Sequence, residues 1–201
     1  MPFSSTSPLP SALPRDRRYE QGGWLLLASL SMFFISSVLL YGLYAYGRRD
    51  DPLSLVPLPK AFLLSTVLLV VTSGLLHVAS LTIRREKRWR TAGLIAISAG
   101  VAIGFLLVQF HAMNETLNGP ALRAGNGKGL AGMVAVLVFL HALHVAGGIL
   151  ALGIVFLRTV LGKYDHERYW PVRFAAHYWH FLDLVWLCML ASFWLTAGSW
   201  G

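Results

Sequence analysis

Histidines inside long apolar stretches are the residues of this chain that could do chemistry. Six of its seven histidines are placed in this way: His77, His111, His141, His144, His177 and His180. A polar side chain in hydrocarbon needs a partner or a cavity. His141 and His144 share one helical face, while His177, His180 and Asp183 repeat at the same spacing. Asp183 is the acidic residue that lies well inside an apolar stretch.

Three kinds of chemistry fit these residues. The first is a polar seam, in which His180 and Asp183 bond to each other or to His141 and His144 and fix the register of two helices. The second is a bis-histidine haem b site between facing helices, which would transfer electrons. The third is a proton relay, which needs titratable groups at several depths. Residue chemistry alone leaves all three open.

Soluble enzyme chemistry has little support in the sequence. The chain has no phosphate-binding loop, no nucleophile beside a base and no paired carboxylates within an apolar stretch. Its single cysteine, Cys188, excludes an internal disulfide and a multi-thiolate metal site. The sequence therefore predicts no catalytic centre in this chain.

The elements that position these side chains are apolar blocks. The chain has 201 residues, of which 56% are hydrophobic and 13% charged. A helix of about 20 residues crosses the hydrocarbon core of a membrane. The blocks predict an all-α, polytopic membrane protein with one membrane domain over 24–201 and an extended or disordered cytoplasmic segment over 1–23. The expected helices cover about 24–47, 61–83, 92–113, 129–157 and 177–197, a bundle of five transmembrane helices.

Charge placement predicts the orientation. The net charge is +8, and twelve Lys and Arg residues lie on one side of the expected bundle against five on the other. The positive-inside rule puts the N-terminus in the cytoplasm and the C-terminus outside. The basic excess therefore reflects topology, and nucleic acid is not an expected partner.

Glycines on two of the expected helices predict close packing. Gly100 and Gly104 form a GxxxG pair, and Gly147, Gly148 and Gly153 follow the two histidines of the fourth helix. Small residues let two helices approach closely where no hydrophobic force acts between them.

Two motifs resemble a known family. The fourth expected helix carries His-x-x-His-Val followed by Gly148, and the fifth carries Tyr-Trp-His-Phe-Leu-Asp-Leu-Val-Trp-Leu from Tyr178 to Leu187. An earlier helix carries Thr72, Ser73, Gly74 and His77. These segments resemble subunit III of the haem–copper (cytochrome c and quinol) oxidases, in the short five-helix form.

The resemblance implies a non-catalytic integral membrane subunit of a respiratory oxidase in a prokaryotic cell (plasma) membrane. Such a subunit packs on and stabilises the catalytic subunit I, contacts other oxidase subunits and binds structural phospholipid. Haem and copper are then expected in partner subunits, and no cofactor or metal in this chain. The residues expected to serve helix packing and subunit or lipid contact are His77, His141, His144, Trp179, His180, Asp183 and Trp186.

Three positions depart from the family pattern. The family has buried or interfacial Glu residues where this chain has the Leu30–Ser31 region, Ala112 and Arg173. Their loss favours a scaffold over a proton relay. The alternatives are an accessory subunit of a nitric oxide reductase, a bis-histidine haem b protein and a stand-alone transporter.

Overall fold

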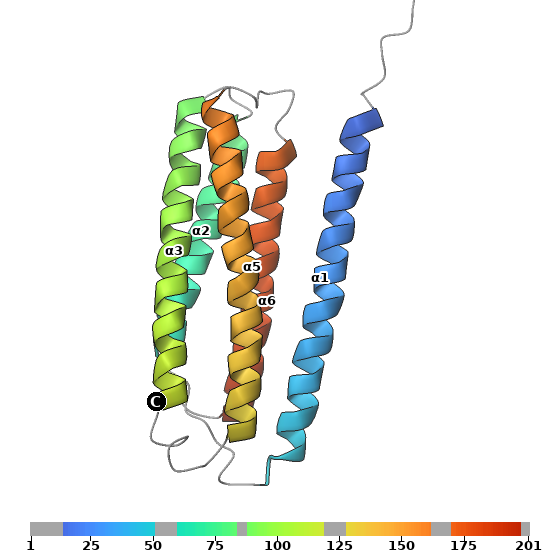
Figure 1. Cartoon of the computed structure of the whole chain (residues 1–201), viewed down its shortest axis with the longest axis vertical. Helices are drawn as coiled ribbons and strands as arrows, with labels where there is room; N and C mark the ends of the chain where they lie inside the picture. The colour runs from blue at the N-terminus through green and yellow to red at the C-terminus, as the bar shows by residue number, and fades with distance from the viewer. Residues whose placement is uncertain (1–13, 51–59, 84–87, 119–127, 162–169, 198–201) are drawn as a thin grey trace, which may run out of the picture.

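The fold consists of long helices in every part of the chain that the structure describes. This computed structural model describes residues 14–50, 60–83, 88–118, 128–161 and 170–197. The helices are α1 (Pro14–Gly47), α2 (Ala61–Ile83), α3 (Arg88–Asn118), α5 (Lys128–Val160) and α6 (Trp170–Ala197) (Figure 1). All five are long and apolar enough to cross a membrane. The expected all-α class with five spans is therefore confirmed, as a helix bonds its own backbone groups where lipid offers no partner.

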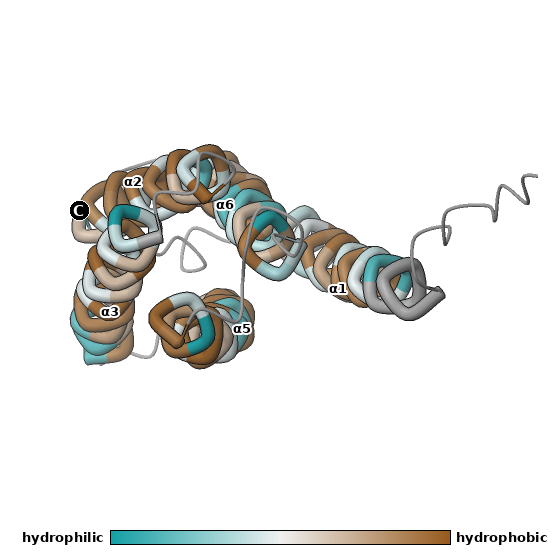
Figure 2. Tube along the Cα trace, turned by 90° about the horizontal axis from the view of Figure 1, so that it is seen from above, coloured by the Kyte–Doolittle hydropathy of each residue, from teal (hydrophilic) through white to brown (hydrophobic). Residues whose placement is uncertain are grey.

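Four helices form a closed unit and the fifth lies beside it. α2 contacts α3 and α6, α3 contacts α5, and α5 contacts α6, whereas α1 contacts α6 and α5. From above, α3, α2, α6 and α1 follow one another in an arc, with α5 on its inner side (Figure 2). Side chains of α1 contact α6 along much of the helix, from the ion pair of Glu20 and Arg173 to the hydrogen bond between Tyr41 and Thr196. None of the described helices lies against the outer side of α2 and α6 (Figure 2).

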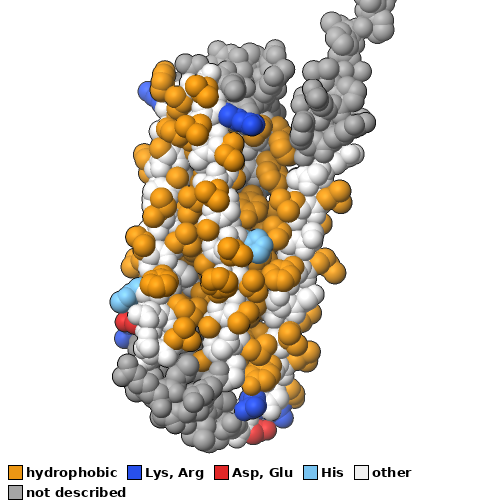
Figure 3. Space-filling model, viewed as in Figure 1, with side chains coloured by type: hydrophobic (Ala, Val, Ile, Leu, Met, Phe, Trp, Pro, Cys, Tyr) orange, Lys and Arg blue, Asp and Glu red, His pale blue; other side chains and the backbone are white. Residues whose placement is uncertain are grey.

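The surface of the bundle is as apolar as its core. Large side chains such as Leu43, Leu150 and Leu195 are 72–76% exposed. On the visible face, orange apolar side chains cover the middle while Lys and Arg lie near the two ends (Figure 3). This pattern suits hydrocarbon around the middle and water or headgroups at the ends.

Two helices begin earlier than their hydropathy predicts. α1 begins at Pro14, so the expectation of an extended segment is wrong for residues 14–23, while 1–13 lie outside the described residues. α6 begins at Trp170 rather than near 177. Proline is favoured in the first turn, where its missing N–H is not needed, and Pro14 and Pro171 occupy such positions. Hydropathy marks the hydrocarbon part of a helix, not the helical turns that continue beyond it.

Of the glycines expected to pack closely against another helix, one on α5 does so. A Cβ on Gly148 would lie 3.0 Å from Tyr178 and 3.2 Å from Trp179, so α6 approaches the backbone of α5 closely there. Cβ atoms on Gly100 and Gly104 would meet no described atom within 4 Å, and the same holds for Gly147 and Gly153. The expected close packing of the Gly100–Gly104 pair is therefore not made within the described part of the chain.

Candidate functional site

Trp186 lies at the centre of the four-helix unit. Its side chain is fully buried and its indole N–H donates to the hydroxyl of Thr66 on α2 over 2.8 Å. Its ring centroid lies 5.6 Å from that of Phe62, 5.9 Å from Phe105 and 5.4 Å from His141. One aromatic side chain of α6 thus contacts α2, α3 and α5, which sets how the four helices pack.

His141 is enclosed by aromatic rings. The imidazole is fully buried, and its ring centroid lies 6.2 Å from Phe34, 6.0 Å from Phe105 and 5.4 Å from Trp186. Neither ring nitrogen has a hydrogen-bond partner among the described residues, and the same is true of the buried amide of Gln109. His141 therefore acts in this fold as a packing group, and the expected bonds to His180 or Asp183 are not made.

His144 belongs to the contact between α5 and α6. Its Nδ1–H donates to the carbonyl of Leu140 on its own helix over 2.7 Å, and its backbone carbonyl accepts from the Tyr178 hydroxyl over 2.9 Å. Trp179, which is buried, packs beside Gly148. The two motifs singled out in the sequence meet here, through a hydroxyl, a backbone carbonyl and a glycine.

A second polar group joins α2 and α6. The Ser73 hydroxyl is hydrogen-bonded to Nδ1 of His180, and Asp183 lies one turn further along α6. Oδ1 of Asp183 is buried without a hydrogen-bond partner within the residues described. The rings of His77 and His180 lie 5.7 Å apart, and both side chains are exposed on the outer surface of the bundle. We call Ser73, His77, His180 and Asp183 the α2–α6 polar face.

The α2–α6 polar face lies deep within its two helices. Because α6 runs from Trp170 to Ala197, Asp183 lies at the middle of the helix. Ser73 is likewise near the middle of α2, which runs from Ala61 to Ile83. The α2–α6 polar face is therefore at the centre of the apolar spans, where a polar group is most costly.

The sequence identified His180 and Trp186 but not the residues to which they are hydrogen-bonded. Ser73 is the partner of His180, and Thr66 is the acceptor for Trp186. Both lie on α2, seven residues apart and hence on one face of the helix. Hydroxyl residues recurring at that spacing in an apolar helix were the available signal.

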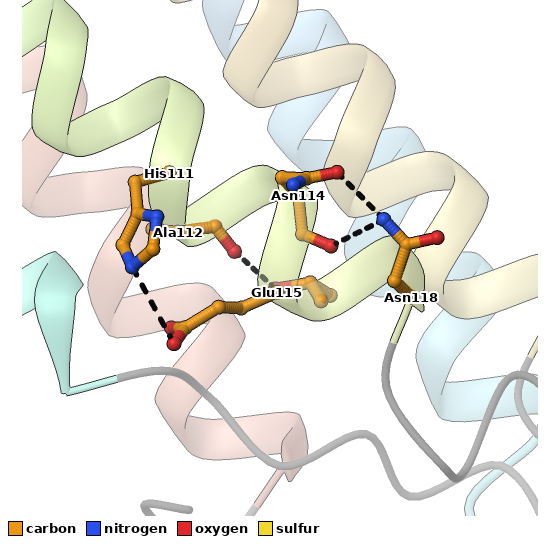
Figure 4. A network of polar contacts seen from close by, with 6 residues as sticks. His111, Ala112, Asn114, Glu115 and Asn118 are labelled. Carbon is orange, nitrogen blue, oxygen red and sulfur yellow. Dashed lines mark hydrogen bonds and ion pairs between the residues drawn. The ribbon is translucent and has the colours of Figure 1, made fainter.

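His111 lies apart from these groups. Its Nε2 is 3.6 Å from a carboxylate oxygen of Glu115, and the two side chains are 71% and 55% exposed (Figure 4). The pair is near the end of α3, beside the bond from Asn118 to Asn114. Such an exposed pair contributes little to stability. No group of three or more His, Cys, Asp or Glu side chains placed to hold a metal occurs among the described residues.

The fold and these contacts define a polytopic helical membrane protein whose intramembrane polar side chains connect helices. Comparison with known proteins supplies the family. Residues 24–199 match the family model described as cytochrome c oxidase subunit III. The chain therefore belongs to the cytochrome c oxidase subunit III family, as its two motifs predict.

Individual relatives agree with the family. The chain is 24% identical over 191 residues to cytochrome bo(3) ubiquinol oxidase subunit 3 of Pseudomonas aeruginosa, covering 90% of this chain and 88% of that one. It is 29% identical over 148 residues to cytochrome c oxidase subunit 3 of Carassius auratus, covering 73% and 55%. With the subunit of the same name from Thermostichus vulcanus it shares 24% identity over 134 residues, 63% and 61% of the two chains. The matches to the last two relatives thus span little more than half of each relative's length.

Proposed function

We propose that this chain is the subunit III of a respiratory haem–copper oxidase in a prokaryotic plasma membrane. In this function it packs on the catalytic subunit I, stabilises it, contacts the other oxidase subunits and holds structural phospholipid. Electron transfer and oxygen reduction take place at haem and copper held by partner subunits. The orientation predicted from the charges, with the N-terminus in the cytoplasm, is part of this proposal.

The observation that carries the proposal is the use made of the family's motif residues. Tyr178, Trp179 and Trp186 connect α6 to its neighbours, and His180 connects it to α2. Side chains used in this way build a scaffold. The family match over residues 24–199 gives that scaffold its expected place in an oxidase.

Purification from the native membrane tests the proposal. The chain, tagged at one end and extracted in a mild detergent, should bring with it a much larger complex that contains haem, subunit I and bound phospholipid. That complex should reduce oxygen, and deletion of this chain should lower the yield or lifetime of active subunit I. Re-expression of the untagged chain is the control.

Two outcomes would contradict the proposal. A chain that purifies alone, in a strain whose oxidase remains fully active without it, is not an oxidase subunit. A complex that reduces nitric oxide and not oxygen would move the chain to the accessory subunit of a nitric oxide reductase.

A further inference from the structure

The α2–α6 polar face is exposed where this chain should meet hydrocarbon. His77 and His180 are exposed in the isolated chain, and Asp183 is partly so. His180 and Asp183 lie near the middle of α6, and His77 lies six residues before the end of α2. Ionisable side chains within a membrane almost always face a partner or a water-filled cavity, since their exposure to lipid is costly. Lipid is therefore a poor occupant of this surface.

The other outer surfaces of the bundle suit lipid. The outer side of α3 presents Ile103, Leu107 and Phe110, and that of α5 presents Leu143 and Leu150. His111 is the titratable exception on α3, but it lies near the end of that helix and has Glu115 beside it. Near mid-membrane, the α2–α6 polar face groups the titratable side chains of His180 and Asp183 with His77, whereas on α5 the half-buried His144 has its Nδ1 bonded to Leu140 of its own helix.

We propose that the α2–α6 polar face is the surface by which this chain docks on a transmembrane helix of the catalytic subunit, and that this helix supplies a hydrogen-bonding side chain to His180 or His77. The inference rests on the proposed function, and it names the face and the chemistry of the partner. Nδ1 of His180 is already bonded to Ser73, so Nε2 is the ring nitrogen left for a partner. An imidazole nitrogen can donate or accept, according to its tautomer.

The surroundings of the polar groups fit a helix–helix contact. Val70 and Val78 on α2 and Leu184 and Leu187 on α6 are exposed around them, which gives a polar centre with an apolar rim. Gly74 is exposed between Ser73 and His77, and a Cβ there would meet no described atom within 4 Å. A small residue at this point lets the partner helix approach closely.

A second copy of this chain fits the face less well than a different helix. A two-fold contact places the same patch of both copies together. Here it would bring two Asp183 carboxyls towards each other at mid-membrane, with the same imidazoles around them. A different helix can offer complementary groups to the exposed rings of His77 and His180.

Photo-crosslinking in the intact complex tests the docking face. A photoreactive benzoylphenylalanine replaces Leu184, which is 61% exposed and one turn beyond His180. Matched controls replace Leu107 on α3 and Leu150 on α5, which are 66% and 72% exposed. We expect Leu184 to give a crosslink to the catalytic subunit severalfold stronger than either control. A crosslink from Leu184 to a second copy or to lipid alone, or a stronger one from a control, overturns the docking face.

A pair of histidine variants gives a second readout. His180→Phe should reduce severalfold the fraction of the chain that co-purifies with the catalytic subunit, while His111→Phe on α3 should leave it unchanged. Equal co-purification of both variants with the wild type overturns the inference. If His180→Phe does not accumulate, the crosslinking experiment alone tests the docking face. If the wild-type chain itself brings down no oxidase, the proposed function fails, whereas a recovered oxidase that crosslinks elsewhere removes only the docking face.

Discussion

The indole nitrogen of Trp186 lies 2.8 Å from the hydroxyl oxygen of Thr66, which makes this bond a direct tie between α6 and α2. The Thr66 hydroxyl gives its own proton to the carbonyl of Phe62 over 2.7 Å. It therefore accepts from Trp186 with a lone pair, and both groups are satisfied in a place without water. Four helices converge on this bond because the Trp186 ring also contacts Phe105 and His141.

Thr66→Val tests the tie between α2 and α6. The substitution keeps the shape of the side chain and leaves the buried Trp186 N–H without an acceptor, which costs about 1–3 kcal/mol of unfolding free energy. Thr82→Val is the matched control, because the Thr82 hydroxyl bonds only to the carbonyl of Val78 on its own helix among the described residues. Unfolding in detergent micelles measures both. Equal stability of the two variants would show that the bond contributes nothing.

Adjacent glycines on α5 allow a sharper comparison. Gly148→Ala places a methyl group 3.0 Å from Tyr178 and 3.2 Å from Trp179, so two rings must move. We expect a loss of about 1–3 kcal/mol, typical of overpacking. Gly147→Ala meets no described atom within 4 Å and should be neutral or stabilising by up to about 1 kcal/mol through helix propensity. The same unfolding assay compares them, and a neutral Gly148→Ala would contradict the close approach.

Features that depend on local sequence can be predicted from it, whereas contacts between distant segments cannot. Apolar length predicts all five spans, since crossing the hydrocarbon is a local requirement. The motifs single out Trp179, His180 and Trp186, which contact neighbouring helices in the structure. The partners of His180 and Trp186 depend on how α2 is rotated about its own axis relative to α6. The sequence of one helix does not determine that rotation. His141 and Asp183 were expected to share a seam, but His141 is enclosed by Phe34, Phe105 and Trp186 in the core, and Asp183 lies one turn from His180 on the α2–α6 polar face.

The Ser73 hydroxyl connects α2 to α6. Ser73→Ala removes the hydroxyl that bonds to His180. Interhelical hydrogen bonds in membranes are worth about 0.6 kcal/mol on average and at most about 1.7. We expect a loss in that range, together with weaker co-purification of the catalytic subunit.

Ser80→Ala is the control for Ser73→Ala. It removes a hydroxyl of the same helix that bonds to the carbonyl of His77 over 2.7 Å. It should change neither stability nor co-purification. A Ser73→Ala chain that behaves like Ser80→Ala would mean that His180 is held by packing alone.

The N-terminal parts of α1 and α6 are joined by opposite charges. Nη2 of Arg173 lies 3.3 Å from a carboxylate oxygen of Glu20, and the side chains are 37% and 40% exposed. Arg173→Glu turns this attraction into repulsion, and we expect a loss of no more than about 1 kcal/mol because water screens the pair. The double variant Arg173→Glu with Glu20→Arg should recover most of the loss in the unfolding assay. No recovery would show that the two charges act independently.

His141 allows packing and haem ligation to be distinguished in one experiment. Its imidazole lies among Phe34, Phe105 and Trp186, and neither nitrogen has a partner in the described chain. His141→Phe keeps a ring in place and removes two unsatisfied polar atoms. Their removal stabilises the fold by about 1–3 kcal/mol, which offsets the cost of packing the larger ring. We expect its unfolding free energy to stay within about 1 kcal/mol of the wild type. His141→Ala leaves a cavity and should lose about 2–5 kcal/mol. The absorption spectrum of the purified chain should show no Soret band in the wild type or in either variant. A haem band in the wild type that His141→Phe abolishes would establish this chain as a haem b protein and remove the packing role of His141.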